Sequence, residues 1–178
     1  RSAPTLTEGN TQVDHATTDS GAFSTIIPAN GKWYAEFKAT EVSSNTSGIA
    51  VQNLTDEEAS WRADAFQNAK GYMFFMNGAT GTNTGSTTSY GSAWSADDII
   101  GIAMDLTNGK LYFAINNTWQ DSGDPTSGAT GTGAAFSIDA GDSHALGSAY
   151  KSDLRGQWNF GNPAFAISSG NADANGYG

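Results

Sequence analysis

Residues 98–115 read DIIGIAMDLTNGKLYFAI, a pattern that predicts a β-hairpin. Alternate residues are apolar over 100–106, and the alternation resumes over 111–115. A period of two is typical of a strand with one buried face. Between the two runs, residues 107–110 are expected to turn, because the pair Asn108-Gly109 favours a type I′ turn with positive φ at both central residues. The two runs should therefore pair as antiparallel strands.

The same alternation predicts strands along the rest of the chain. Residues 33–42 carry the clearest further pattern, with Trp33, Ala35, Phe37 and Ala39 on one face. Many short strands separated by turns indicate an all-β, two-layer antiparallel β-sandwich. Further strands are predicted at 47–54, 61–66, 71–76, 134–138, 145–150, 157–160 and 164–168, with weaker signals near Val13 and at 23–27, one short helical turn at 56–61, and polar loops at 77–89 and 121–133.

Length and composition fit one domain spanning residues 1–178. A chain of 178 residues can bury a single core, and its 22 glycines agree with many tight turns. The net charge of −10 argues against nucleic acid and anionic membrane surfaces as partners, and no apolar run reaches the length of a membrane span. There is no cysteine for a disulfide or a thiolate metal site. Because the chain starts at Arg1, we expect it to be part of a longer protein.

Several motifs, taken in order, resemble those of a SPRY domain, a concanavalin-like β-sandwich of the jelly-roll type. They cover most of the chain, from about residue 5 to residue 167. The segments that carry the resemblance are Gly31-Lys32-Trp33-Tyr34-Ala35-Glu36-Phe37, Gly48-Ile49-Ala50-Val51, Gly71-Tyr72-Met73-Phe74-Phe75, residues 98–106, Asn108-Gly109, Leu111-Tyr112-Phe113, Asn116, Ala135-Phe136, Trp158-Asn159-Phe160-Gly161 and Phe165.

Three features depart from the family pattern. Asp97-Asp98 stands where the family usually has Gly-Asp, and Asn116-Asn117 stands where it usually has Asn-Gly. Asp and Asn both tolerate turns, so the resemblance still implies the same fold. The third departure is a longer connection at 119–132, and this longer version is similar to the SPRY-like modules of structural proteins in tailed bacteriophages.

The resemblance implies recognition, because SPRY domains hold partner proteins with loops at one end of the sandwich and relatives of the same fold hold sugars. We therefore expect a non-enzymatic binding and display module of a phage virion protein, located at the virion surface on capsid, fibre or tail. Its partner would be a host-surface glycan or another protein, with a homo-oligomeric virion assembly as one arrangement. A cellular SPRY adaptor that binds peptides, a concanavalin-like glycoside hydrolase or lyase, and a purely structural domain remain alternatives.

The sequence offers little catalytic chemistry, and no cofactor is expected. In the run Asp142-Ser143-His144, consecutive side chains of an extended chain point to opposite faces, so a triad cannot be assumed. Glycosidases need two carboxylates about 5 to 9 Å apart, commonly from alternate residues of one strand, and no such pair of glutamates occurs. Four aspartates in predicted turns have the oxygen ligands that calcium favours, but turn formation explains them without a metal: Asp121, Asp124, Asp139 and Asp142.

Ligand contacts are expected from aromatic, Arg and Asp side chains beside the polar loops. Trp119 and Tyr90 flank these loops, and Trp61-Arg62 forms a second pair beside an acidic turn. Aromatic faces can stack on sugar rings, while Asp121 and Asp124 can accept hydrogen bonds from hydroxyl groups. Core packing is predicted instead for Trp33, Phe37, Trp94, Phe113, Trp158 and Phe160.

Overall fold

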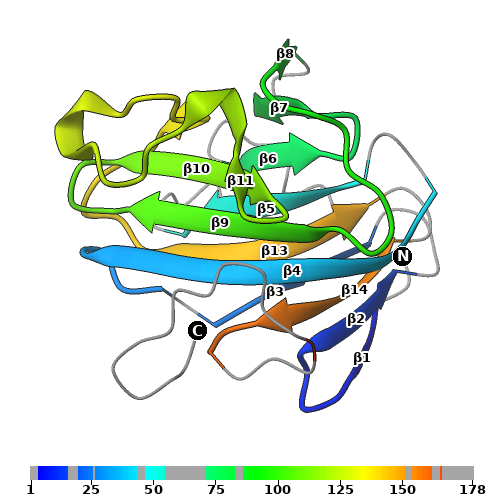
Figure 1. The fold of residues 1–178 in the computed structure, drawn as a ribbon. Coiled ribbons are helices and arrows are strands. Elements are labelled where there is room, and N and C mark those ends of the chain that lie inside the picture. The colour runs from blue at the N-terminus through cyan, green and yellow to red at the C-terminus, as the bar shows by residue number, and fades with distance from the viewer. Residues whose placement is uncertain are drawn as a thin grey trace.

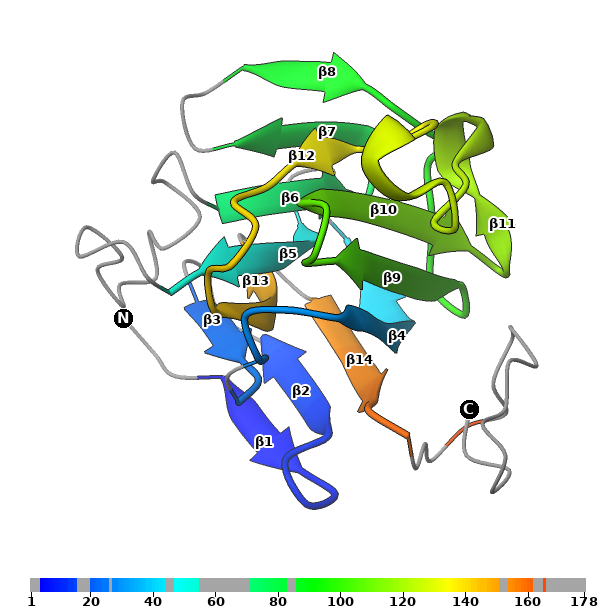
Figure 2. The same cartoon turned by 90° about the vertical axis from the view of Figure 1, so that its left-hand side faces the viewer.

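The computed structural model describes residues 4–15, 20–25, 27–43, 47–54, 71–82, 86–150, 154–161 and 165. These residues form two antiparallel sheets packed face to face, which confirms the predicted all-β sandwich (Figure 1). Figure 2 shows β1, β2 and β3 together at one side of the sandwich and β8 at the opposite side.

The first sheet has the order β1-β2-β14-β4-β9-β10-β11, and β12 also pairs with β10. The predicted hairpin lies here as β9 and β10, with Phe113 opposite Ile102. The bounds are β1 Thr5–Thr7, β2 Gln12–His15, β4 Lys32–Val42, β9 Ile99–Asp105, β10 Lys110–Ile115, β11 Thr118–Trp119, β12 Phe136–Ser137 and β14 Leu154–Asn159.

The second sheet has the order β3-β13-β5-β6-β7-β8. Its centre is formed by β5 and β6, which the sequence predicts from their apolar runs. The bounds are β3 Ser20–Phe23, β5 Gly48–Asn53, β6 Gly71–Phe75, β7 Ala79–Thr82, β8 Thr87–Ser89 and β13 His144–Tyr150.

The core lies between the sheets, where the inward-facing residues of both layers meet. Phe113 of the first sheet stacks on Phe74 of the second, with ring centroids 5.0 Å apart and planes 18° apart. Both are fully buried, as are Phe37 and Ile102, while Trp94 is 2% exposed. Each such side chain contributes roughly 1.5 to 3 kcal/mol relative to exposure. The predicted core positions of Phe37, Trp94, Phe113 and Trp158 are therefore confirmed.

Two aromatic residues predicted for the core are exposed instead. Trp33 is 41% exposed and Phe160 is 51% exposed. Trp33 lies at the beginning of β4, and Phe160 follows the last residue of β14, so both lie where the sheet ends. Alternation along a strand predicts which face a side chain occupies, but it does not show how far the opposite layer extends.

The β9–β10 hairpin closes with a longer turn than predicted. Asp105 pairs with Lys110, so the connection spans residues 106–109. Only Gly109 in this connection has positive φ, at 62°, which rules out the type I′ turn at Asn108-Gly109. The two-residue turn with positive φ at both positions occurs instead at Asn116-Asn117, between β10 and β11.

The prediction of a loop at 77–89 is wrong for two segments of that range, which form strands. Residues 79–82 form β7 and residues 87–89 form β8, and Thr80 pairs with Thr88. β8 is the exposed edge strand of the second sheet and β7 lies between it and β6, and neither strand has the alternating large apolar residues that mark a core strand. Their composition therefore resembled that of a loop.

Some sequence predictions fall outside the described residues. These are the helical turn at 56–61, the strand at 61–66 with Trp61 and Arg62, and the strand at 164–168 apart from Phe165. Within the described part of the chain, no helix has the length and apolar character required to cross a bilayer.

Candidate functional site

Three aromatic side chains meet on the outer face of the first sheet. Tyr34 of β4, Tyr112 of β10 and Trp119 of β11 alternate with core residues and therefore point away from the core. The ring of Trp119 lies edge-on to Tyr34, with centroids 6.2 Å apart, and edge-on to Tyr112 at 6.5 Å. Tyr34 is 37% exposed and Trp119 is half-buried. We call these three residues the aromatic cluster.

Gly101 of β9 allows Tyr34 to lie close against the sheet. A Cβ atom at this position would come within 2.8 Å of the Tyr34 hydroxyl oxygen. That hydroxyl donates a hydrogen bond of 2.9 Å to Oε1 of Glu36, and Asn159 donates one of 3.1 Å to Oε2 of Glu36. The fully buried Glu36 carboxylate thus fixes the orientation of Tyr34.

Residues 120–134 fold over the outer face beside the aromatic cluster, and we call them the covering loop. In Figure 1 this loop is the yellow-green segment beyond β10 and β11. It buries Tyr112, whose side chain is 1% exposed and whose hydroxyl lies 3.3 Å from Oγ of Ser127. The predicted loop at 121–133 is thus an ordered cover on the sheet, with two short 3₁₀ turns at Gln120–Ser122 and Gly128–Thr130.

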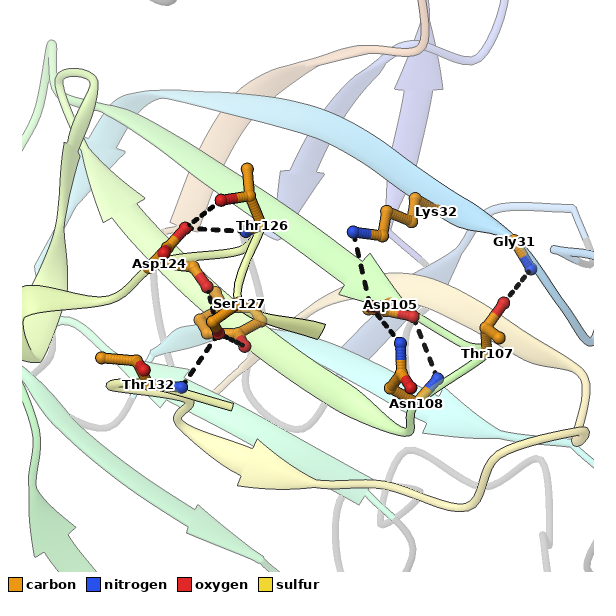
Figure 3. Close-up of polar contacts among 10 residues, drawn as sticks. Gly31, Lys32, Asp105, Thr107, Asn108, Asp124, Thr126, Ser127 and Thr132 are labelled. Atoms are coloured by element: carbon orange, nitrogen blue, oxygen red, sulfur yellow. Dashed lines mark hydrogen bonds and ion pairs between the residues drawn. The ribbon is translucent and has the colours of Figure 1, made fainter. Parts of the chain in front are cut away.

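Internal hydrogen bonds hold the covering loop in shape (Figure 3). Oδ1 of Asp124 accepts bonds from the backbone N–H and the hydroxyl of Thr126, at 2.8 and 2.6 Å. Ser127 donates its hydroxyl to the carbonyl of Asp124 at 2.6 Å and accepts the N–H of Thr132 at 3.0 Å. The side-chain and backbone bonds from Thr126 lower the pKa of Asp124 below its ordinary value. Asp124 is therefore an exposed, ionised carboxylate that also closes a turn.

The side chains of Gln120 and Tyr90 hold the covering loop in place through hydrogen bonds. The buried Gln120 side chain accepts the Ser92 N–H at 2.9 Å and donates to the carbonyl of Thr118 at 2.7 Å. Tyr90 donates its hydroxyl to the carbonyl of Gly133 at 3.1 Å. Burial raises the pKa of Tyr90 to about 12, so the hydroxyl keeps its proton. The structure thus gives Tyr90 a supporting position under the loop.

The backbone on both sides of Trp119 adopts left-handed conformations. Asn116 and Asn117 precede it with φ of 47° and 63°, and Asp121 and Ser122 follow it with φ of 50° and 55°. Such conformations cost about 1 kcal/mol or more for residues other than glycine, although Asn and Asp tolerate them better. Two tight turns therefore fix the position of the Trp119 side chain before any ligand binds.

A charged pair borders the outer face near the hairpin turn (Figure 3). Lys32 Nζ lies 3.6 Å from Oδ2 of Asp105, and Asp105 also accepts bonds from the backbone and side-chain nitrogens of Asn108 at 3.0 and 2.8 Å. Burial alone would raise the pKa of Asp105, but the two bonds from Asn108 and the charge of Lys32 together lower it. The Lys32 side chain is 57% exposed and adds a cation beside the covering loop.

The structure brings together three of the residues predicted for the site. Trp119, Asp121 and Asp124 lie at one end of the covering loop or within it, and both aspartates are exposed. Sequence reasoning missed Tyr34 and Lys32, although their alternation with the core residues of β4 places them on the outer face.

The four aspartates considered for calcium form two separate groups. Asp121 and Asp124 belong to the covering loop, whereas Asp139 and Asp142 both accept hydrogen bonds from the side-chain nitrogen of Asn53, at 3.3 and 2.8 Å. In the described ranges, no three His, Asp or Glu side chains gather in a way that could hold a metal ion.

Both histidines lie away from the covering loop, in buried positions. Nε2 of His15 is 2.9 Å from Oγ of Ser148, so this pair joins β2 of the first sheet to β13 of the second. His144 contacts the backbone carbonyl of Asp142 through Nδ1, at 2.9 Å, rather than the carboxylate. Neither arrangement presents a relay to the surface.

The fold has a counterpart among solved structures. The crystal structure of the SPRY domain of human HERC1 superposes with a TM-score of 0.60, covering 87% of this chain and 91% of that chain. The fold is SPRY-like. At 14% sequence identity this similarity shows the SPRY-like fold alone. No family model matches the sequence, and no curated protein matches it either.

Proposed function

We propose that this SPRY-like domain is a non-enzymatic binding and display module on the virion surface of a tailed bacteriophage, where it recognises a host-surface glycan. The observation that carries the proposal is the half-buried Trp119 ring, which packs in T-shaped contact with Tyr34 and Tyr112 beside a structured loop. Support for a phage source comes from the length of the 119–132 connection, the feature that resembles phage structural modules.

The chemistry of the outer face suits a sugar. Aromatic faces stack on the apolar faces of sugar rings, and ionised carboxylates accept hydrogen bonds from sugar hydroxyls. The aromatic cluster supplies rings for stacking, and the exposed Asp121 and Asp124 supply the hydrogen-bond acceptors. Because hydrogen bonds and two tight turns already order the loop, binding loses little conformational entropy.

The test is a binding screen against bacterial surface polysaccharides and whole bacterial cells. We expect Trp119→Ala to weaken binding at least about tenfold, since a central aromatic contact contributes most of the affinity in such sites. Asp121→Asn keeps the turn geometry but removes the charge, and it should weaken binding several-fold. Thr88→Ala, on the exposed edge strand β8, is the matched control and should bind like the native protein.

Three results would contradict the proposal. Equal binding of native protein and Trp119→Ala to the same targets would remove the aromatic cluster from the site. A fall in the mass of the bound polysaccharide during incubation, seen by mass spectrometry, would show cleavage and favour the glycosidase or lyase alternative. Cell binding that no soluble glycan displaces would favour a protein partner.

A further inference from the structure

A second apolar surface adjoins the aromatic cluster and shares Tyr34 with it, while no residue of the covering loop lines it. Among the described residues, four large apolar side chains are exposed, and all of them line one groove of about 580 Å³: Leu6 at 44%, Trp33 at 41%, Tyr34 at 37% and Phe160 at 51%. Exposed apolar side chains scattered over a surface need no explanation, but a contiguous group marks a binding site. We call this feature the interlayer groove.

The interlayer groove opens where the edges of the two sheets come together. One side is formed by the hairpin of β1 and β2, the edge of the first sheet. The other is formed by β3, the edge of the second, together with Ser24, Thr25, Ile27 and Pro28. Figure 2 shows these three strands on the same side of the sandwich. The deeper lining comes from core residues of both layers, including Val13, Met104 and Leu146, which are 1 to 2% exposed. The groove therefore extends into the core between the sheets.

The described residues of the lining are all uncharged, although the chain has 26 charged residues, 8 basic and 18 acidic. Several of its polar side chains also make hydrogen bonds within the protein. Trp33 Nε1 donates to the carbonyl of Asn30 at 2.8 Å, and Thr11 donates its hydroxyl to the carbonyl of Glu8 at 2.7 Å. Ser24 donates its hydroxyl to the carbonyl of Thr25 at 2.8 Å and accepts the Leu146 N–H at 3.0 Å. A charged occupant would therefore lose hydration without meeting an opposite charge among the described lining residues.

We propose that the interlayer groove binds an uncharged apolar molecule of small-molecule size, at a site that adjoins the proposed glycan site and shares only Tyr34 with the aromatic cluster. Its volume lies within the range of about 300 to 1,000 Å³ that is typical of such pockets. The rings of Trp158 and Phe160 are stacked, with centroids 5.4 Å apart and planes 9° apart, so they present a flat aromatic wall. The ligand is therefore held by apolar and aromatic contacts, with neither an anionic nor a cationic head group inside the groove.

The test uses N-phenyl-1-naphthylamine, a neutral probe whose fluorescence rises in apolar surroundings. We expect saturable binding of one probe per chain. Trp33→Ala and Phe160→Ala each remove an exposed aromatic wall, and each should weaken probe binding about tenfold. Because both side chains are substantially exposed, the variants should remain folded, which circular dichroism checks. Thr88→Ala is the control and should bind the probe like the native protein.

Specific results would contradict the proposal that the groove binds an apolar small molecule. Absence of saturable binding, or equal binding by all three variants, would overturn the proposal. Light scattering tests whether a second copy of the chain fills the groove instead. A native dimer that Phe160→Ala converts to a monomer would assign the groove to self-association, and a native monomer that binds the probe supports the small-molecule site. Loss of glycan binding in Trp119→Ala bears on neither result, since Trp119 does not line the groove.

Discussion

The hydroxyl of Tyr90 donates a hydrogen bond to the carbonyl oxygen of Gly133 across 3.1 Å. Tyr90 follows β8 of the second sheet, whereas Gly133 belongs to the covering loop on the first. The Tyr90 ring is also edge-on to Phe74 and Phe113, one from each sheet, with centroids 5.9 and 6.4 Å apart. A single side chain thus ties the candidate site to the packing between the layers.

Replacing Tyr90 with Phe should loosen the covering loop without disturbing the core. The variant keeps the ring but loses the hydrogen bond to Gly133, which is expected to lower the free energy of unfolding by about 1 kcal/mol. Urea denaturation measures this change. In an ultraviolet titration of the native protein, the late ionisation of Tyr90 near pH 12 should disappear in the variant. Unchanged stability and an unchanged titration would contradict the anchoring role.

Acid should destabilise the protein through His15. Burial lowers the pKa of His15 to about 4, while nearby Asp14 raises it by a smaller amount, and the ordinary value is 6.5. The unfolded chain therefore binds a proton at higher pH than the folded protein does. The contribution of His15 is complete above pH 6.5 and is lost as the pH falls toward 4, by about 3 kcal/mol in total.

Urea midpoints between pH 7 and pH 4 measure this effect, and His15→Gln provides the comparison. The variant should be less stable than the native protein at pH 7, because the contact with Ser148 changes, but its stability should fall less between pH 6.5 and 4. Parallel pH profiles for the two proteins would assign the acid sensitivity to other groups.

The two residues of the β10–β11 turn should respond differently to glycine. Asn117 has φ of 63°, and Asn117→Gly should raise the free energy of unfolding by a few tenths to about 1 kcal/mol. Asn116 also has positive φ, but its side chain accepts the Ile99 N–H at 2.9 Å and donates to Asp98 at 2.7 Å. Asn116→Gly should therefore destabilise by about 1 to 2 kcal/mol. Thermal denaturation compares the stabilities of the two variants. Equal effects would contradict the different roles assigned to Asn116 and Asn117.

Adding a methyl group at Gly101 should disturb the aromatic cluster more than the fold. The new Cβ of Gly101→Ala would meet the Tyr34 hydroxyl, the end of a side chain that can rotate away. We expect the Tyr34–Glu36 hydrogen bond to break, with a loss of about 1 kcal/mol of stability and several-fold weaker glycan binding. Tyr34→Phe, which removes the hydroxyl but leaves the glycine, is the matched control for the hydrogen bond. Native-like glycan binding by Gly101→Ala would mean that glycan binding does not require Tyr34 to lie close against the sheet.

The periodicity of the sequence predicts most of the fold, because alternation along a strand follows directly from which side chains face the core. It predicts the β9–β10 hairpin and the burial of Phe37 and Phe113. It fails for Trp33 and Phe160, whose exposure depends on where the opposite sheet ends. It also misses β7 and β8, because their Ala, Thr, Gly and Ser residues show no alternation of large apolar side chains.

The position of the covering loop in the sequence could be predicted from its composition, but the structure of the loop could not be predicted in this way. Trp119, Asp121 and Asp124 are found together as expected, since they are close in the sequence. The contribution of Tyr34 depends on pairing between strands that are far apart in the chain, which no local pattern reveals. The same is true of the interlayer groove, whose lining is drawn from both sheets.

The position of β14 has a consequence for how the molecule is made. This strand, residues 154–159, pairs with β2 on one side and β4 on the other, and β13 likewise lies between β3 and β5. During synthesis on the ribosome, 143 residues precede β13, which begins at His144. The edges of β2, β3, β4 and β5 that pair with β13 and β14 therefore remain unpaired until these last strands are made. Such long-range pairing is associated with slow folding and with a period of vulnerability to aggregation. We therefore expect the nascent chain to depend on chaperones until the last two strands have been translated.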